Sequence, residues 1–345
     1  MKAIDQNLDL DEGACVFGAK ILLKHDQALA GEVAGLLGGG QDPELIHRAR
    51  VASRRLRATL PLFIDCVPRR KSKAWLKQIR RVTQKLGEAR DSDVQIEVLE
   101  KAIGSLTDQQ YAPGIERLLL RMRQLRGTLQ EPALDAMHRL GDSSALEEMQ
   151  EYFDLLASRE DSVYLYTPTL YRHSFNAIQR RLDTFLSFDA VVPHPEAARE
   201  LHEMRIAAKW LRYTLETFAS LYSNELKTYI DSVKEAQELL GDLHDCDVWL
   251  SFLPQFSMEE QQRTLDYTGS LESMQSITPG LEYFTQDREQ KRDQSYTEFK
   301  TKWQQWKDEG LWQALHQTIQ VPFLQPEDIY PPLTSEPQNQ DEHGH

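Results

Sequence analysis

Residues 47–60 read HRARVASRRLRATL, and residues 202–215 read HEMRIAAKWLRYTL. A second phrase follows each copy, LGEARDSDV at residues 86–94 and LGDLHDCDV at residues 240–248. The first phrase returns after 155 residues (from 47 to 202) and the second after 154 (from 86 to 240), in the same order. Two ordered motifs that recur at nearly the same spacing predict a duplicated structural unit.

Both copies of the first phrase place basic residues along one stripe of an α-helix, about 80° wide at 100° per residue. The stripe consists of His47, Arg50, Arg54 and Arg57 in the first copy and of His202, Arg205, Lys209 and Arg212 in the second. Apolar residues such as Leu56 and Leu211 fall on the opposite side, which we expect to face the core. Because like charges three or four residues apart repel each other, the stripes indicate that an anion supplies the missing counter-charge.

A third helix in each unit extends the basic pattern unequally. Lys73, Lys77 and Arg80 share one face in the first unit, whereas the second unit has Lys227, Asp231 and Lys234 at these positions. Residues 47–90 contain 14 basic residues (Lys and Arg) and 2 acidic ones (Asp and Glu), whereas residues 202–245 contain 5 basic and 8 acidic residues. The whole chain has a net charge of −14. An acidic chain with one basic segment is suited to binding a polyanion locally, and we expect the first unit to contribute more. The alternative is that these arginines pair with acids on neighbouring helices.

Helical periodicity dominates the chain and predicts an all-α fold. We expect two four-helix bundles related by a pseudo-twofold axis, with extra helices, in one domain over residues 10–322. The predicted repeats cover residues 14–158 and 166–318, and residues 323–345 are predicted to be a disordered tail. We expect helix breaks at Gly87 and near residue 131, a helix start at Thr167 and Pro168, and a final packing helix over residues 286–318.

Composition indicates a globular protein of the cytoplasm. The first residues are acidic and lack the apolar stretch of a signal peptide, and no apolar run reaches the length of a membrane span. Cys15, Cys66 and Cys246 are odd in number and widely spaced, so we expect no disulfide framework and no zinc site. This cysteine usage is typical of a reducing compartment.

The two phrases together resemble the CHAD family, the conserved-histidine α-helical domain, over roughly residues 10–320. Their shared pattern is H-x-x-R-[VI]-x-x-[RK]-x-L-R followed by L-G-x-x-[RH]-D-x-D-V. The resemblance implies two four-helix bundles and a basic cavity that binds inorganic polyphosphate, without established catalysis, often at polyphosphate granules. Many family members carry a CYTH triphosphatase domain with the motif E-x-E-x-K, and the sequence contains no such motif, which predicts a stand-alone CHAD protein.

Phosphate chemistry agrees with this resemblance. Polyphosphate offers negative charge and no base or sugar, so a protein can bind it only through charge and hydrogen-bond donors; Arg holds two oxygens at once and Lys acts as a point charge. The candidate polyphosphate-binding residues are His47, Arg50, Arg54, Arg57, Lys73, Lys77, Arg80, Arg90, His202, Arg205, Lys209, Arg212, Lys227 and Lys234, with Lys20, Lys24, His25 and Arg172 as extensions on the first helix of each unit. We expect no cofactor and no membrane partner.

The second phrase permits two interpretations. The His244-Asp245 pair resembles part of the ligand set of metal-dependent phosphohydrolases, and Asp91 with Asp93 resembles a magnesium-binding pair. Arg90 stands where His244 stands in the other copy and cannot bind a metal ion, so we favour helix capping and pairing with Arg90 or His244 for these acids. A nucleic-acid binder is the other alternative, disfavoured because few aromatic residues interleave with the basic stripes.

Overall fold

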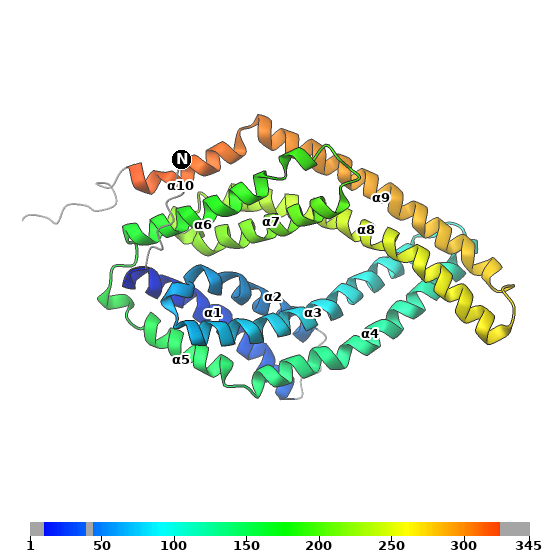
Figure 1. Cartoon of the computed structure of the whole chain (residues 1–345), viewed down its shortest axis with the longest axis horizontal. Coiled ribbons are helices and arrows are strands. Elements are labelled where there is room, and N and C mark those ends of the chain that lie inside the picture. The colour runs from blue at the N-terminus through cyan, green and yellow to red at the C-terminus, as the bar shows by residue number, and fades with distance from the viewer. Residues whose placement is uncertain (1–9, 39–43, 325–345) are drawn as a thin grey trace, which may run out of the picture.

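The computed structural model describes residues 10–38 and 44–324, and every regular element in these ranges is helical, which confirms the all-α fold (Figure 1). The first half contains α1 (Glu12–Leu37), α2 (Glu44–Thr59), the 3-10 helix η1 (Leu60–Cys66), α3 (Arg69–Gly104), η2 (Gln109–Tyr111), α4 (Ala112–Gly141), α5 (Ala145–Ala157) and η3 (Glu160–Ser162). The second half contains α6 (Pro168–Leu186), η4 (Asp189–Val191), α7 (Ala198–Phe218), η5 (Ala219–Tyr222), α8 (Lys227–Thr268), α9 (Met274–Asp308) and α10 (Leu311–Leu324).

The order of the main elements is the same in the two halves: two helices, a 3-10 turn, two long helices and a short helix. The duplication itself stays an interpretation of the sequence. Residues 323 and 324 of the predicted tail belong to α10, and residues 325–345 lie outside the described ranges. None of the helices within the described ranges is long and apolar enough to cross a bilayer.

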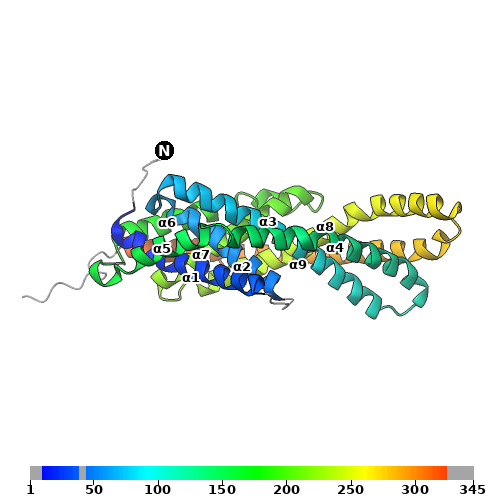
Figure 2. The same cartoon turned by 90° about the horizontal axis from the view of Figure 1, so that it is seen from below.

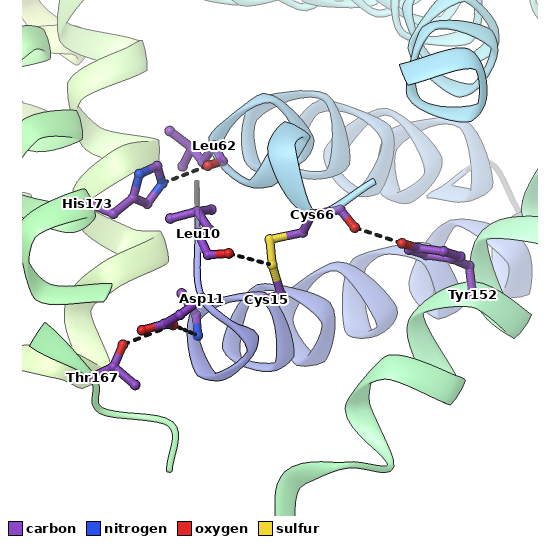
Figure 3. Close-up of a disulfide and its surroundings, with 9 residues drawn as sticks. Leu10, Asp11, Cys15, Leu62, Cys66, Tyr152, Thr167 and His173 are labelled. Carbon is purple, nitrogen blue, oxygen red and sulfur yellow. Dashed lines mark hydrogen bonds between the residues drawn. A yellow bond between two sulfur atoms is a disulfide. The ribbon is translucent and has the colours of Figure 1, made fainter. Parts of the chain in front are cut away.

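Local sequence explains where several helices begin. The Asp11 carboxylate accepts a hydrogen bond from the Ala14 amide at 2.9 Å at the start of α1, and the Thr167 hydroxyl accepts one from the Leu170 amide at 3.1 Å at the start of α6. Pro168 occupies the first helical position, where its missing N–H costs nothing. The predicted start at Thr167 and Pro168 is therefore confirmed. The two caps also meet, because the Thr167 hydroxyl donates to Asp11 at 3.1 Å (Figure 3).

The long helices α3, α4 and α8 continue through positions where the sequence predicts a break. Gly87 lies inside α3 and α4 continues through Pro132, so these two expected helix ends are wrong, and Gly241, the counterpart of Gly87, likewise lies inside α8. The residues that follow keep their buried helical spacing, as Ala89 and Leu99 do in α3, and burial outweighs the cost of about 1 kcal/mol for a glycine. The predicted final helix is instead two helices, α9 and α10, separated by Gly310 in the left-handed region (φ +65°).

The two halves share one continuous hydrophobic core rather than two separate ones. α2 packs against α7, and the Phe63 ring of η1 lies 5.8 Å from the Phe218 ring at the end of α7. His173 of α6 also donates to the Leu62 carbonyl of η1 at 2.7 Å (Figure 3). A second cluster joins the halves at the end where α3–α4 and α8–α9 project beyond the other helices (Figure 2). There α4 crosses α9 at Gly114 and Gly280, where any side chain would collide with backbone.

A disulfide joins Cys15 of α1 to Cys66 of η1, with their Cα atoms 5.4 Å apart (Figure 3). The Tyr152 hydroxyl of α5 donates to the Cys66 carbonyl at 2.7 Å, so three elements meet at this point. The sequence-based expectation of no disulfide is therefore wrong, because packing brings together two cysteines that are 51 residues apart. The cysteine argument for a reducing compartment fails with it. Cys246 is free and buried.

Candidate functional site

A cavity of about 490 Å³ lies between the two halves, lined by residues of α2, α3, α7 and α8. These four helices carry the two copies of both sequence phrases. The cations that line the cavity are Arg50 and Arg54 of α2, Arg90 of α3, and Arg205 and Lys209 of α7. The other polar lining residues are Asp91, Gln95, Gln237, His244 and Asp245, and Val94, Val98, Ile206, Val248 and Trp249 supply apolar surface.

The helical stripes expected from the sequence position these cations. On α2 the side of Ala49 and Leu56 is fully buried in the core, which leaves the side of Arg50 and Arg54 facing the cavity. The same division holds on α7, where Leu211 is buried and Lys209 lines the cavity. Since α2 packs against α7, the stripes of the two halves face each other across one space.

The clustered cations destabilise one another. Burial, together with the positive charges of Arg205 and Arg54, lowers the pKa of Lys209 to about 8. Burial likewise lowers the pKa of Arg54, where the positive charges of Arg50 and Arg212 add to the effect. A negatively charged ligand would reverse both penalties, because an opposite charge favours the ionised form.

Several buried donor atoms around the cavity have no hydrogen-bond partner among the described residues. They are the Nε atoms of Arg54, Arg205 and Arg212 and the Nδ1 atom of His202. The Arg212 side chain is 12% exposed and its Nε lies 3.5 Å from Glu216, an ion pair too long for a good hydrogen bond. Buried polar groups are nearly always satisfied in folded proteins, so a cluster of unsatisfied donors indicates a place where acceptors bind.

The two motif histidines of the second half pack against each other, with the His202 and His244 ring centroids 3.8 Å apart. Burial and the neighbouring charges of His202 and Arg205 lower the pKa of His244 to about 4. Burial and the charges of Arg205 and Lys209 also lower the pKa of His202. Both rings are therefore neutral at pH 7 and act as hydrogen-bonding groups there.

The aspartates of the second phrase do not cap helices, because they lie inside α3 and α8. Three of these aspartates form ion pairs, as expected, but with partners other than Arg90 and His244. Asp91 pairs with Arg50 at 3.3 Å, Asp93 with Arg126 at 2.6 Å, and Asp247 with Arg292. Arg90 pairs instead with Glu97 at 2.8 Å. Burial raises the pKa of Asp245, which lines the cavity. No cluster of three or more His, Cys, Asp or Glu arranged to hold a metal ion occurs within the described ranges.

The remaining candidate residues lie outside the cavity lining. Arg57, Arg212 and His202 border it, since each interacts electrostatically or through ring contact with a lining residue. Lys73, Lys77 and Arg80 line a separate groove on α3, and half-buried His47 lies on α2. Lys227 is exposed on α8, and Lys234 pairs there with Glu238 at 3.7 Å. On the first helix of each half, Lys20 pairs with Glu160, and Lys24 and Arg172 are exposed. Burial and the positive charges of Arg55 and Lys24 lower the pKa of His25 to about 4.

Sequence reasoning missed the role of Tyr213 and Gln237. The Arg54 and Arg212 guanidinium groups lie over the Tyr213 ring, 5.5 Å and 5.0 Å from its centre, so this ring holds cations from both halves. Gln237 of α8 lines the cavity, and its Oε1 atom is buried without a hydrogen-bond partner in the part of the chain that the structure describes. The position of Tyr213 one residue after Arg212 was a usable signal, whereas nothing in the sequence singles out Gln237.

Comparisons with known proteins agree with this architecture. The crystal structure of the CHAD domain from the plant Ricinus communis superposes with a TM-score of 0.54 and 24% identity, covering 82% of this chain and 96% of that one. PptA from Streptomyces chartreusis also superposes with a TM-score of 0.54, at 18% identity, covering 83% and 99%. No curated protein matches the sequence. The sequence model of the CHAD domain matches residues 20–254, which is more than half of the chain, and the protein therefore belongs to the CHAD family.

Proposed function

We propose that this protein binds inorganic polyphosphate in the cavity between its halves and has no catalysis of its own. The observation that carries the proposal is the convergence of Arg54 and Lys209 on one cavity, in which no acid of the described ranges pairs with either of them. Unsatisfied donor atoms border the same space. Polyphosphate supplies both the negative charge and the acceptor oxygens that this arrangement needs.

The aromatic rings in and beside the cavity offer little to a nucleobase, and Trp249, which lines the cavity, is only 2% exposed. Tyr213 is covered by Arg54 and Arg212, and Trp210 carries Arg181 at 5.5 Å from its ring centre, so two aromatic residues near the stripes are already engaged by cations. Single-stranded nucleic acids gain affinity from free aromatic faces on which bases stack. This favours polyphosphate over RNA as the ligand.

A phosphohydrolase is the less favoured alternative. A two-metal or single-metal hydrolase needs carboxylates that are free to bind the ion. Here Asp91, Asp93 and Asp247 pair with arginines. Only Asp245 of the four motif aspartates has no ion pair within the described ranges, and one carboxylate does not form a metal site.

The test is a binding comparison at physiological salt of long-chain polyphosphate, RNA and duplex DNA with the wild type and Arg54→Ala/Lys209→Ala. We expect polyphosphate to bind most tightly and the double variant to lose most of that affinity. Arg199→Ala/Lys300→Ala removes the same number of charges from exposed positions outside the cavity and should change little. Tighter binding of RNA under matched conditions, or equal losses in the two variants, would contradict the proposal.

A further inference from the structure

The ring of Tyr213 lies at the junction between the two halves of the molecule. Tyr213 belongs to α7, is 5% exposed and does not itself line the cavity. The guanidinium carbon of Arg54, from α2, lies 5.5 Å from the centre of this ring, and that of Arg212, from α7, lies 5.0 Å from it. Arg54 lines the cavity and Arg212 borders it. One buried ring therefore holds a cation of each half directly beside the candidate site.

The ring offsets part of the penalty that these cations carry. Burial, together with the positive charges of Arg50 and Arg212, lowers the pKa of Arg54, and no carboxylate of the described ranges pairs with it. The face of an aromatic ring attracts a cation, and the attraction is strongest where water is excluded. The Tyr213 ring therefore stabilises two charged groups close together without supplying a carboxylate that would compete with an anionic ligand.

The ring also limits the directions that the two long side chains can take. A planar guanidinium group that stacks on an aromatic face keeps fewer orientations than a free one. The Nε atoms of Arg54 and Arg212 are buried without a hydrogen-bond partner within the described ranges. The Glu216 carboxylate lies 3.5 Å from the Arg212 Nε. Without the ring, Arg212 would be free to close on Glu216, and the site would lose one of its cations.

The two repeated phrases differ at this position. Ala58 stands 155 residues before Tyr213, at the corresponding place in the first phrase, and is 6% exposed. A buried alanine occupies the position in one copy, so the helical motif itself does not require an aromatic residue there. A single ring that serves Arg54 and Arg212 together fits one site formed between the halves.

We propose that Tyr213 is a positioning residue, whose ring fixes the Arg54 and Arg212 guanidinium groups so that one phosphate chain contacts cations of both halves at once. This inference rests on the proposed function of the cavity. It assigns to Tyr213 an effect on affinity that acts through the two arginines and not through contact with the ligand. Side chains that are already held in place lose less conformational freedom on binding, so the ligand binds more tightly.

Substitutions at residue 213 can separate the ring from the hydroxyl. The hydroxyl is buried without a hydrogen-bond partner among the described residues. Phenylalanine keeps the ring and removes this unsatisfied group, which should cost no stability. Leucine keeps a buried apolar side chain and removes the ring. A positioning role of the ring therefore predicts that phenylalanine preserves binding and that leucine does not.

The experiment measures the affinity of one long-chain polyphosphate for the wild type, Tyr213→Phe and Tyr213→Leu by calorimetric titration at matched salt. We expect Tyr213→Phe to stay within about twofold of the wild type and Tyr213→Leu to bind about tenfold more weakly. In Arg54→Ala/Arg212→Ala, the added change Tyr213→Leu should alter the affinity by less than about twofold, because the ring then has no cation to position.

Tyr222 of η5 provides the matched control. It is also 5% exposed, but its hydroxyl lies 2.7 Å from the Ser174 hydroxyl and its ring lies 6.2 Å from the Tyr171 ring. Tyr222→Leu should lower the melting temperature, because it removes a buried aromatic side chain, and should leave the affinity for polyphosphate within about twofold of the wild type. Circular dichroism checks that every variant is folded.

The outcomes separate this inference from the proposed function. Equal losses of affinity in Tyr213→Phe and Tyr213→Leu would assign the effect to the hydroxyl. An equal loss from Tyr213→Leu with and without the two arginines would make its role purely structural. Either result, or full affinity in Tyr213→Leu, overturns the inference and leaves the cavity assignment standing. A wild type that does not bind polyphosphate would overturn the proposed function and the inference with it.

Discussion

The two halves of the molecule differ strongly in charge but contribute similarly to the cavity. Residues 47–90 carry 14 basic and 2 acidic residues, whereas residues 202–245 carry 5 and 8. Nevertheless the cavity receives Arg50, Arg54 and Arg90 from the first half and Arg205 and Lys209 from the second. The difference in segment charge is therefore not a difference at the site.

The acids of the second half explain this result. Glu235 and Asp242 pair with Lys302 and Lys291 of α9, at 3.0 Å and 3.9 Å, and Glu238 pairs with Lys234 along α8. None of these acids lines the cavity. The electrostatic field inside the cavity depends on the direction in which each charged side chain points from its helix. A count of charged residues along the sequence does not give that direction.

The largest expected effect tests this equality directly. Arg50→Ala/Arg54→Ala/Arg57→Ala and Arg205→Ala/Lys209→Ala/Arg212→Ala should each weaken tripolyphosphate binding by about a thousandfold, since each charge-assisted bond contributes about 1.5–3 kcal/mol before screening. The two losses should agree within about threefold, because both stripes face one cavity. Titration with one defined ligand measures them.

This result would replace the expectation from sequence that the first unit dominates. Folding should survive both triple changes, because the stripes face away from the core side of α2 and α7; circular dichroism checks it. A clearly greater loss of affinity in the first triple variant would show instead that the net charge of each segment controls binding.

The next prediction contrasts two fully buried carboxylates. Asp26 of α1, in the first half, has no hydrogen-bond partner in the described ranges, and burial raises its pKa to about 7. Glu260 of α8, in the second half, would also have its pKa raised by burial, but hydrogen bonds from Arg121 and Arg117 lower it instead. We expect Asp26→Asn to stabilise the protein at pH 8 by about 3 kcal/mol and Glu260→Gln to destabilise it by a similar amount.

The pH dependence follows from the same shifts. Folded Asp26 holds a proton that the unfolded chain releases near pH 4, so its contribution to stability falls as pH rises from about 4 to 7. Glu260 has the opposite sign, since its stabilising contribution is present above its unfolded pKa and is lost as pH falls through the lower folded value. Denaturant unfolding of the two variants across this range measures both. A destabilised Asp26→Asn variant would show that the Asp26 carboxylate has a partner after all.

A smaller effect distinguishes two matched cavity cations, Lys209 of α7 and Arg54 of α2. The folded pKa of Lys209, about 8, is lower than its ordinary value of 10.5, so charged Lys209 destabilises the folded state below pH 8 and this penalty disappears as pH rises toward 10.5. Lys209→Met should stabilise the free protein by about 2 kcal/mol at pH 7, and this gain should vanish near pH 10. Arg54→Met should stabilise it without that pH dependence, because arginine keeps its proton in this range. Thermal melting at several pH values tests the pair, and a destabilised Lys209→Met variant would contradict the mutual repulsion.

The parts of the fold that depend on local periodicity could be predicted from the sequence. The basic and apolar sides of α2 and α7 and the start of α6 at Thr167 follow from side-chain spacing and capping. The same rule separates Arg90 from Lys73, since 17 steps of about 100° place the two on different sides of α3. In the structure Arg90 lines the cavity, whereas Lys73 lines the separate groove on α3.

The parts that depend on tertiary packing could not be predicted. The continuity of α3 through Gly87 and of α4 through Pro132 results from buried contacts that outweigh local helix preferences. The disulfide between Cys15 and Cys66 requires that α1 and η1 pack side by side, and no spacing of cysteines contains that information. The sharing of one core by both halves likewise appears only when α2 meets α7.

The smallest expected effect concerns Asp91 and Asp245, which stand at matching positions of the two halves and both line the cavity. Asp91 pairs with Arg50 and is 72% exposed on its side chain, so it competes with an anionic ligand for that arginine. We expect Asp91→Asn and Asp245→Asn each to tighten polyphosphate binding by about threefold, since exposed or partly screened charges contribute less than about 1 kcal/mol. Asp93→Asn, which breaks a pair with Arg126 outside the cavity lining, should leave affinity unchanged. If these acids instead held a catalytic metal ion, the wild type would release phosphate from polyphosphate in a Mg²⁺-dependent reaction and Asp91→Asn would abolish it. Tighter polyphosphate binding by both Asp91→Asn and Asp245→Asn, with no release of phosphate by the wild type, would show that the two aspartates adjust the affinity of one shared anion site.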